Sequence, residues 1–345
     1  MVTALKTSIN ILLVFLFAAC TSVPDERMTP YVDFPETREL TARTLSLDSA
    51  LFRYPYRVRV QDDKAVVLDL HGTEYFFHAF HYPGFHYLSS FGKRGDAPEE
   101  MLSAENLRWN GNFLWTLDSN KSELTRLGFA SSGDSLLRLE AVSLDEELLR
   151  ALDFVQYDDS TFIIPDYSGD SRFCLVSRQG KLLHKIGTIP TTDEDALKNA
   201  HPALAQAWRS FIDYNPRNGV LAAVTQLGEV LEIYNLKDST HIVRIGPNGE
   251  PEFQISQGYG IPTGIMGFSD IQVTDSAIYV VFQGRAFKDI MQKAQQGINL
   301  PDGGQNIYVF SLEGKPLRKY VLDHYIHGIS VDEQKGIIIA TDVNK

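Results

Sequence analysis

Cysteine is scarce in this chain: only Cys20 and Cys174 occur among 345 residues. Cys20 ends the N-terminal apolar run, so its processing would leave Cys174 alone and no internal disulfide is expected. Cys174 lies in the apolar run RFCLV, which predicts a buried, unreactive thiol. Basic residues are also few, with 32 Lys and Arg against 44 Asp and Glu and a formal net charge of -12. This charge argues against a nucleic-acid partner, which requires clustered positive residues.

Motifs for common enzyme chemistry are missing as well. No G-x-G-x-x-G, Walker, G-x-S-x-G or H-E-x-x-H pattern is present. The stretch FGKRGDAPEEM (91–101) has two glycines and two basic residues, but a proline and glutamates follow where a phosphate loop needs a helix. His78 and His81 fall on opposite faces of a regular strand, which weakens a shared metal site. The motifs therefore assign no catalytic residue, no metal ligand and no cofactor.

One long hydrophobic run is present, at the N-terminus. Ile9–Phe17 follows Lys6 and is short for a permanent transmembrane helix. It leads into Ala18, Ala19 and Cys20, which is similar to a bacterial lipobox except that phenylalanine stands where leucine is usual. We predict a signal peptide over 1–19, lipidation at Cys20, and a flexible proline-containing tether over 20–38. The chain is then expected in the cell envelope, anchored to the outer membrane on its periplasmic or surface side. An ordinary cleaved signal peptide is the alternative.

Six copies of one short pattern follow: an alternating strand, a polar turn and a second apolar strand. The copies are RVRVQDDKAVVLD (57–69), NLRWNGNFLWTLD (106–118), DFVQYDDSTFIIPD (153–166), FIDYNPRNGVLAAV (211–224), DIQVTDSAIYVVF (270–282) and GISVDEQKGIIIATD (328–342). Turns such as DD and NGN are typical of β-hairpins. A second pair of strands follows most copies, for example EVLEIYNL and HIVRIG.

Units of four strands, repeated six times, predict an all-β, six-bladed β-propeller over residues 39–345. Segments 190–208 and 286–297 have helical composition and are expected as short insertions on loops. FGKRGDAPEEM lies between the first and second units, so we interpret it as a crossover between blades.

Closure of the ring requires the two ends of the chain. The sixth copy supplies two strands before Lys345, so the last blade is expected to be incomplete, with three strands or fewer. Segment 39–48 alternates like a strand, and we expect it to pair with, or one strand outside, the strand over 337–342. A sequence cut short from a longer chain would also explain the missing strand.

Several stretches resemble a known family. YPYRVRVQDDKAVVLD, FGKRGDAPEEM, SDIQVTDSAIYVVFQGR and IYVFSLEGKPLRKYVLDHYIHGISVDEQKGIIIATD are similar to sequences of the TolB-like six-bladed propeller lipoproteins of Bacteroidetes. The similarity to NHL-repeat propellers is more distant. The resemblance covers about residue 45 to the end. It implies the fold and the cell envelope, and it implies no activity.

The innermost strands carry polar residues that are expected to converge on a central channel. Aligning the copies places Arg59, Arg108, Gln156, Asp213, Gln272 and Ser330 at one register. These groups are either the polar lining of a water-filled channel or a ligand site. The candidate ligand-binding residues are Arg57, Arg59, Asn106, Arg108, Asp213, Asp270, Gln272 and His327. Asn106, Asp153 and Asp270 offer oxygen ligands for calcium, but the three arginines would oppose a cation.

Taken together, these features favour a non-catalytic binding module of the envelope. Its partners would be the membrane, through the N-terminal lipid, and a protein or small ligand on one face of the propeller. A metal-dependent hydrolase or lactonase of the propeller type is the alternative function, and a structural subunit of an envelope assembly is a third.

Overall fold

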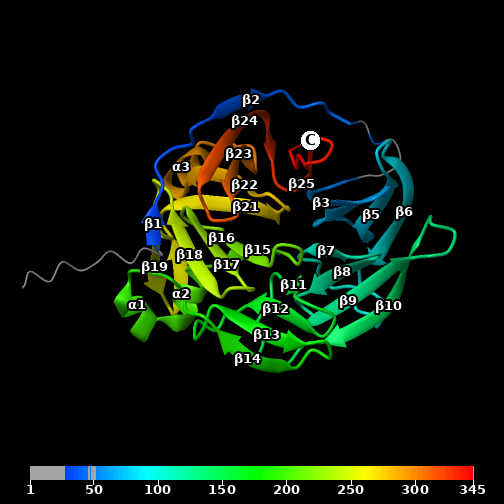
Figure 1. Cartoon of the computed structure of the whole chain (residues 1–345), viewed down its shortest axis with the longest axis horizontal. Helices are drawn as coiled ribbons and strands as arrows, with labels where there is room; N and C mark the ends of the chain where they lie inside the picture. Colours follow the sequence, from blue (N-terminus) through cyan, green and yellow to red (C-terminus); the bar gives the residue numbers. More distant parts are fainter. Residues whose placement is uncertain (1–27, 46, 48–51, 345) are drawn as a thin grey trace, which may run out of the picture.

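A computed structural model of the chain describes residues 28–45, 47 and 52–344. Figure 1 shows its β-sheets arranged around a common centre, each sheet running from an innermost strand to an outer edge. Five sheets contain four consecutive strands of the chain, and a sixth contains two. The fold is therefore an all-β propeller with an incomplete last blade, as the repeats predict.

The six predicted copies coincide with the two inner strands of the six blades. Blade one is β3 (Pro55–Gln61), β4 (Lys64–Asp69), β5 (Tyr75–His81) and β6 (His86–Lys93), and blade two is β7 (Leu107–Asn110), β8 (Phe113–Asp118), β9 (Glu123–Phe129) and β10 (Leu136–Ser143). Blade three is β11 (Val155–Gln156), β12 (Thr161–Pro165), β13 (Phe173–Ser177) and β14 (Leu182–Ile186), and blade four is β15 (Ser210–Asn215), β16 (Val220–Thr225), β17 (Val230–Asn235) and β18 (Thr240–Ile245). Blade five is β21 (Ile265–Val273), β22 (Ala277–Ala286), β23 (Gly304–Ser311) and β24 (Pro316–Ile326), and blade six is β25 (Ile329–Asp332) and β26 (Ile337–Ala340).

Tight turns and packed faces explain why these segments form blades. The β3–β4 and β7–β8 turns place Asp62 and Gly111 at φ angles of 51° and 54°, as two-residue hairpins of this kind require. Apolar side chains fill the space between neighbouring blades. Trp115 of blade two meets Phe162 of blade three edge to face, with ring centroids 5.1 Å apart, in one continuous core cluster. Sheet faces packed in this way position the innermost strands around the centre.

Residues 28–38 differ from the predicted flexible tether. β1 (Met28–Pro30) pairs in parallel with β18 on the outside of blade four, and Figure 1 shows this blue segment running along the outer edges of blades four and five. Tyr31 and Phe34 are buried in the core cluster between those blades, and the Tyr31 hydroxyl donates to Glu229 at 2.7 Å. Residues 28–38 of the expected tether thus contribute to the core, because Tyr31 and Phe34 are buried, whereas residues 20–27 lie outside the described part of the chain.

The predicted pairing of the strand over 39–48 was also wrong. β2 (Thr37–Leu40) pairs in parallel with β24, so that Leu40 lies opposite Leu322 of blade five rather than beside β26. The reason is that β24 is eleven residues long and offers an unpaired outer edge where the segment passes. Residues 46 and 48 lie outside the described part of the chain. The expectation of three strands or fewer is met, because the sixth sheet has β25 and β26.

Helices occur where they were expected. α1 (Glu194–Asn199) and α2 (His201–Ala207) lie between blades three and four, and α3 (Phe287–Gln295) lies between β22 and β23. An additional hairpin, β19 (Phe253–Ser256) and β20 (Tyr259–Pro262), separates blades four and five and contacts α2. Within the described residues, no helix has the length and apolar character needed to cross a membrane.

Candidate functional site

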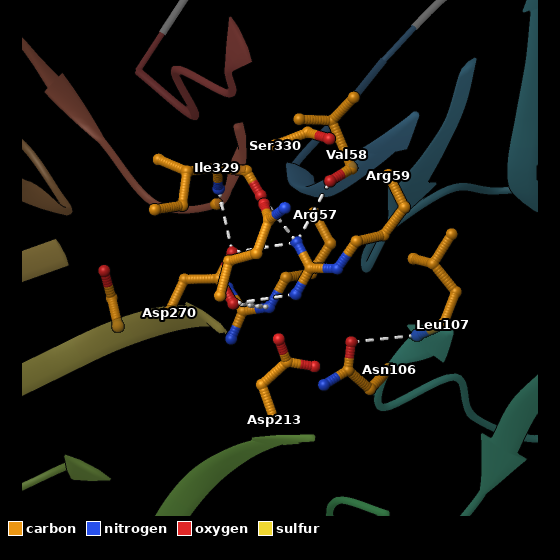
Figure 2. Close-up of polar contacts among 12 residues, drawn as sticks. Arg57, Val58, Arg59, Asn106, Leu107, Asp213, Asp270, Ile329 and Ser330 are labelled. Carbon is orange, nitrogen blue, oxygen red and sulfur yellow. Dashed lines mark hydrogen bonds and ion pairs between the residues drawn. The ribbon is translucent and has the colours of Figure 1, made fainter. Parts of the chain in front are cut away.

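The structure gathers the predicted central residues on the innermost strands. Arg57 and Arg59 project from β3, Arg108 from β7, Asp213 from β15, and Asp270 and Gln272 from β21. Figure 2 shows the residues of blades one, two, four, five and six facing one another across the centre. Most of them are buried, and Asp213 and Gln272 are partly buried.

Asp270 lies at the centre of the first polar cluster. Its carboxylate accepts two hydrogen bonds from the Arg59 guanidinium, at 3.0 and 2.9 Å, and lies 3.3 Å from Nε of Arg57 (Figure 2). The backbone N–H of Ile329 donates to the same carboxylate at 2.8 Å. Burial opposes ionisation of Asp270, but the charges of Arg57 and Arg59 outweigh it and lower the pKa to about 2. Asp270 therefore joins blades one, five and six as a charged group.

Arg108 is the centre of the second cluster. Its guanidinium donates to Asp213 at 2.6 Å, to Asp153 at 3.1 and 3.2 Å, and to the carbonyls of Phe154 and Ile212. Asp153 also accepts the Asn106 amide at 2.8 Å. Burial raises the pKa of Asp213, while the Arg108 charge opposes the rise. These contacts join blades two, three and four.

Side chains on the inner strands also accept backbone hydrogen bonds from the following blade. Five such bonds are present among the described residues, one of them to Asp153, which lies just before β11: Ile212 to Asp153 (2.9 Å), Val273 to Asp213 (2.7 Å), Ile329 to Asp270 (2.8 Å), Val331 to Gln272 (2.7 Å) and Val60 to Ser330 (3.1 Å). The last of them connects blade six to blade one, across the closure of the ring. The central polar residues thus hold neighbouring blades together, whatever else they bind.

Charge at the centre is balanced. Arg57, Arg59 and Arg108 face Asp153, Asp213 and Asp270, three positive groups against three negative ones. The carboxylates that the sequence suggests as candidate calcium ligands, Asp153 and Asp270, therefore contact guanidinium groups. Within the described residues, no group of three or more His, Cys, Asp or Glu side chains is arranged to hold a metal ion.

Two central residues retain unpartnered nitrogens. Nη2 of Arg57 is buried and makes no hydrogen bond within the described chain, and its guanidinium packs over the rings of Tyr56 and Phe211. His327 packs against Tyr56 and lies 3.5 Å from Asp302, and its Nδ1 has no partner there either. Burial lowers the pKa of His327, although the hydrogen bond with Asp302 opposes the shift. His327, which was predicted to be a central residue, therefore contacts Tyr56 and Asp302.

Gln156 does not join the centre. β11 is only two residues long and ends at Gln156, whose amide donates to the carbonyl of Asp158 in the following turn at 3.0 Å. The side chain lies instead in a cleft of about 500 Å³ between blades two and three. The repeat register misplaced this residue because blade three has the shortest inner strand among the described blades.

The cleft between blades two and three is the site that sequence reasoning missed. Its lining residues are Asn110, Gly111, Asn112, Phe113, Trp115, Arg126, Gln156, Asp159 and Arg178. Arg178, in the β13–β14 turn, donates to Glu140 of β10 at 2.6 Å and packs over the Trp115 ring. Arg126, on β9, lies 3.2 Å from the same Glu140 oxygen and packs over the Phe113 ring. Two guanidinium groups therefore share one carboxylate beside an open cleft.

Cys174 agrees with its sequence-based interpretation. It is buried in the core cluster of blades two and three, and burial raises the pKa of its thiol to about 12. A thiol that stays protonated at neutral pH is a poor nucleophile.

Solved structures with a similar fold are distant in sequence. A member of the DUF4221 family from Bacteroides vulgatus is 10% identical, with a TM-score of 0.53 over 86% of this chain and 90% of that one. An auxiliary nutrient binding protein from Bacteroides ovatus is 9% identical, with a TM-score of 0.52 over 85% and 68%. A Bacteroides fragilis protein, whose description proposes that it is exported, is 10% identical, with a TM-score of 0.50 over 83% and 80%. No curated protein matches the sequence.

The family comparison covers most of the propeller. A model described as TolB-like 6-blade propeller-like matches residues 33–334. Its range begins within the segment that packs against blades four and five and ends in the last blade. Together with the observed blades, this match shows that the chain belongs to the TolB-like 6-blade propeller-like family.

Proposed function

We propose that this propeller is a non-catalytic binding module of the cell envelope, anchored by lipid at Cys20, which holds a small ligand in the cleft between blades two and three. One contrast carries the proposal. The central carboxylates are engaged between blades, and the unpartnered nitrogens of Arg57 and His327 belong to groups that pack against aromatic rings. Gln156 and Arg178, in contrast, line a cleft with hydrogen-bonding atoms that have no partner in the described chain. Buried polar atoms without a protein partner can be satisfied by a ligand or by solvent.

The shape of the site supports binding. Loops on one face of a rigid propeller are a common place for ligand recognition, because the blades fix the positions of the side chains. The cleft of about 500 Å³ lies within the range of small-molecule sites. The Bacteroides ovatus relative is described as nutrient binding, and the proposal extends that class of function to this chain.

A ligand panel tests the binding function. Purified full-length protein is heated with glucose, sugar acids, amino acids and dicarboxylates in turn, and unfolding is followed by fluorescence. We expect at least one class to raise Tm, because a ligand that binds only the folded state stabilises it. Gln156→Ala should lose the rise while its own Tm without ligand stays near that of the wild type. Enzymatic turnover of a panel compound, or no rise with any compound, would contradict the proposal.

Lipidation makes a separate prediction. Cells that express the protein are fed a clickable palmitate, and the labelled protein is recovered after detergent extraction. Cys20→Ser should abolish the label, because the thiol of Cys20 is the expected attachment point. Cys174→Ser is the matched control and should keep the label, since that thiol is buried. Label retained by Cys20→Ser would refute lipidation at this residue.

A further inference from the structure

The cleft between blades two and three contains an unusual group of unpartnered polar atoms. Nη1 of Arg178 and Oε1 of Gln156 are buried, and neither has a hydrogen-bond partner in the part of the chain that the structure describes. Nε of Arg126 forms no hydrogen bond there either, although it lies 3.2 Å from the Glu140 carboxylate. All three residues line the same cleft although they come from two different blades. A ligand in this cleft would need an acceptor for guanidinium N–H groups and a donor for one amide oxygen.

The acceptor is most simply an oxyanion. Arg126 and Arg178 share a single protein carboxylate, because both approach the same oxygen of Glu140 at 3.2 and 2.6 Å. One positive charge is therefore left over at the inner wall of the cleft. Asp159 also lines the cleft, but its side chain is exposed at the β11–β12 turn. Guanidinium groups bind carboxylates in a planar, two-pronged geometry.

A hydroxyl group is the donor that would complement Gln156. The amide oxygen of Gln156 can only accept a hydrogen bond, and the amide nitrogen already donates to the carbonyl of Asp158. An apolar wall completes the site, because Phe113 is 39% exposed where it borders the cleft. A small molecule with an anionic end, hydroxyl groups and a C–H face matches these three features.

We propose that the cleft binds a hydroxylated carboxylate of the size of a sugar acid, with its carboxylate on Arg126 and Arg178 and a hydroxyl donating to Gln156. This inference rests on the proposed binding function and specifies its ligand class. The rings under the two arginines hold the guanidinium planes in place, at 4.7 Å from Phe113 and 4.4 Å from Trp115. The anion site is therefore largely preorganised, which reduces the cost of binding.

Isothermal titration of the full-length protein with D-glucuronate tests the ligand class, with D-glucose as the uncharged analogue. The wild type should bind glucuronate saturably and glucose at least about tenfold more weakly, because glucose lacks the charge-assisted bonds. Arg178→Lys should weaken glucuronate binding by about tenfold, since the ammonium group of lysine cannot form the two parallel hydrogen bonds that a planar guanidinium makes with a carboxylate. Arg138→Lys is the matched control: Arg138 also pairs with a glutamate in blade two, at 2.8 Å from Glu123, but does not line the cleft. The Arg138→Lys variant should bind glucuronate as tightly as the wild type does.

Different failures have different meanings. Equal affinities for glucose and glucuronate, or an Arg178→Lys variant that binds glucuronate as the wild type does, would overturn the assignment of an anionic ligand. An uncharged compound that binds through Gln156 while glucuronate does not would overturn the ligand class and leave the proposed binding function standing. Absence of binding by every compound of the panel would refute both.

Discussion

Replacing Asp270 by alanine is expected to lower the free energy of unfolding by about 3–5 kcal/mol, the range seen when one partner of a buried ion pair is removed. The side chain of Asp270 is 1% exposed, and its loss would leave Arg57 and Arg59 as buried charges without their carboxylate. The Ile329 N–H would lose its acceptor at the same time. The contacts among blades one, five and six would then be weakened together.

Urea unfolding followed by circular dichroism measures this effect. Asp63→Ala is the control, because Asp63 also pairs with a basic residue, Lys64, but at an exposed position, and its loss should leave stability unchanged. The pH dependence provides a second readout. The pKa of Asp270 is lowered in the folded state, so its stabilisation is present above the unfolded value of 3.8 and is lost as the pH falls from there towards about 2. Asp270→Ala should lack this part of the acid sensitivity. A stable Asp270→Ala variant would show that the centre does not hold the blades together.

The second large effect is expected at Phe34, in the segment that was predicted to be a tether. Phe34 is 8% exposed and contacts the rings of Tyr31, Tyr308 and Phe310. Phe34→Ala should lower the free energy of unfolding by about 3 kcal/mol, because truncation of a buried phenylalanine leaves a cavity. Thermal or urea unfolding of the full-length protein measures it.

Val32 provides the matched control for Phe34. It lies in the same segment but is 84% exposed, so Val32→Ala should leave the midpoint of unfolding almost unchanged. If Phe34→Ala and Val32→Ala unfold alike, residues 28–38 do not contribute to the core and the flexible tether is the better description.

Sequence reasoning succeeded where the repeats constrain the structure. The inner strands recur, and their shared register predicts a converging set, which contacts across the centre confirm for Arg59, Arg108, Asp213, Gln272 and Ser330. The register failed at Gln156 because β11 ends there and the side chain lines the cleft between blades two and three. A repeat alignment assumes equal strand lengths, and blade three breaks that assumption.

The cleft could not be predicted from the repeats. Arg126 lies on the third strand of blade two, whereas Arg178 lies in the last turn of blade three, so the two are not equivalent positions of one pattern. They meet only because neighbouring blades pack face to face and both approach Glu140. The placement of Tyr31 and Phe34 was missed for a similar reason, because their partners are distant in sequence and the segment has no repeat of its own.

We propose that the middle of the propeller holds the blades together and that the ligand binds between blades two and three. A crystal structure of the full-length protein grown with D-glucuronate distinguishes these two places. We predict density for the sugar acid against Arg126 and Arg178, with a hydroxyl near Gln156, and no change in the contacts of Asp270 and Arg108. Density for the compound at the centre, beside Arg57 and Asp213, with the cleft empty, would contradict the claim.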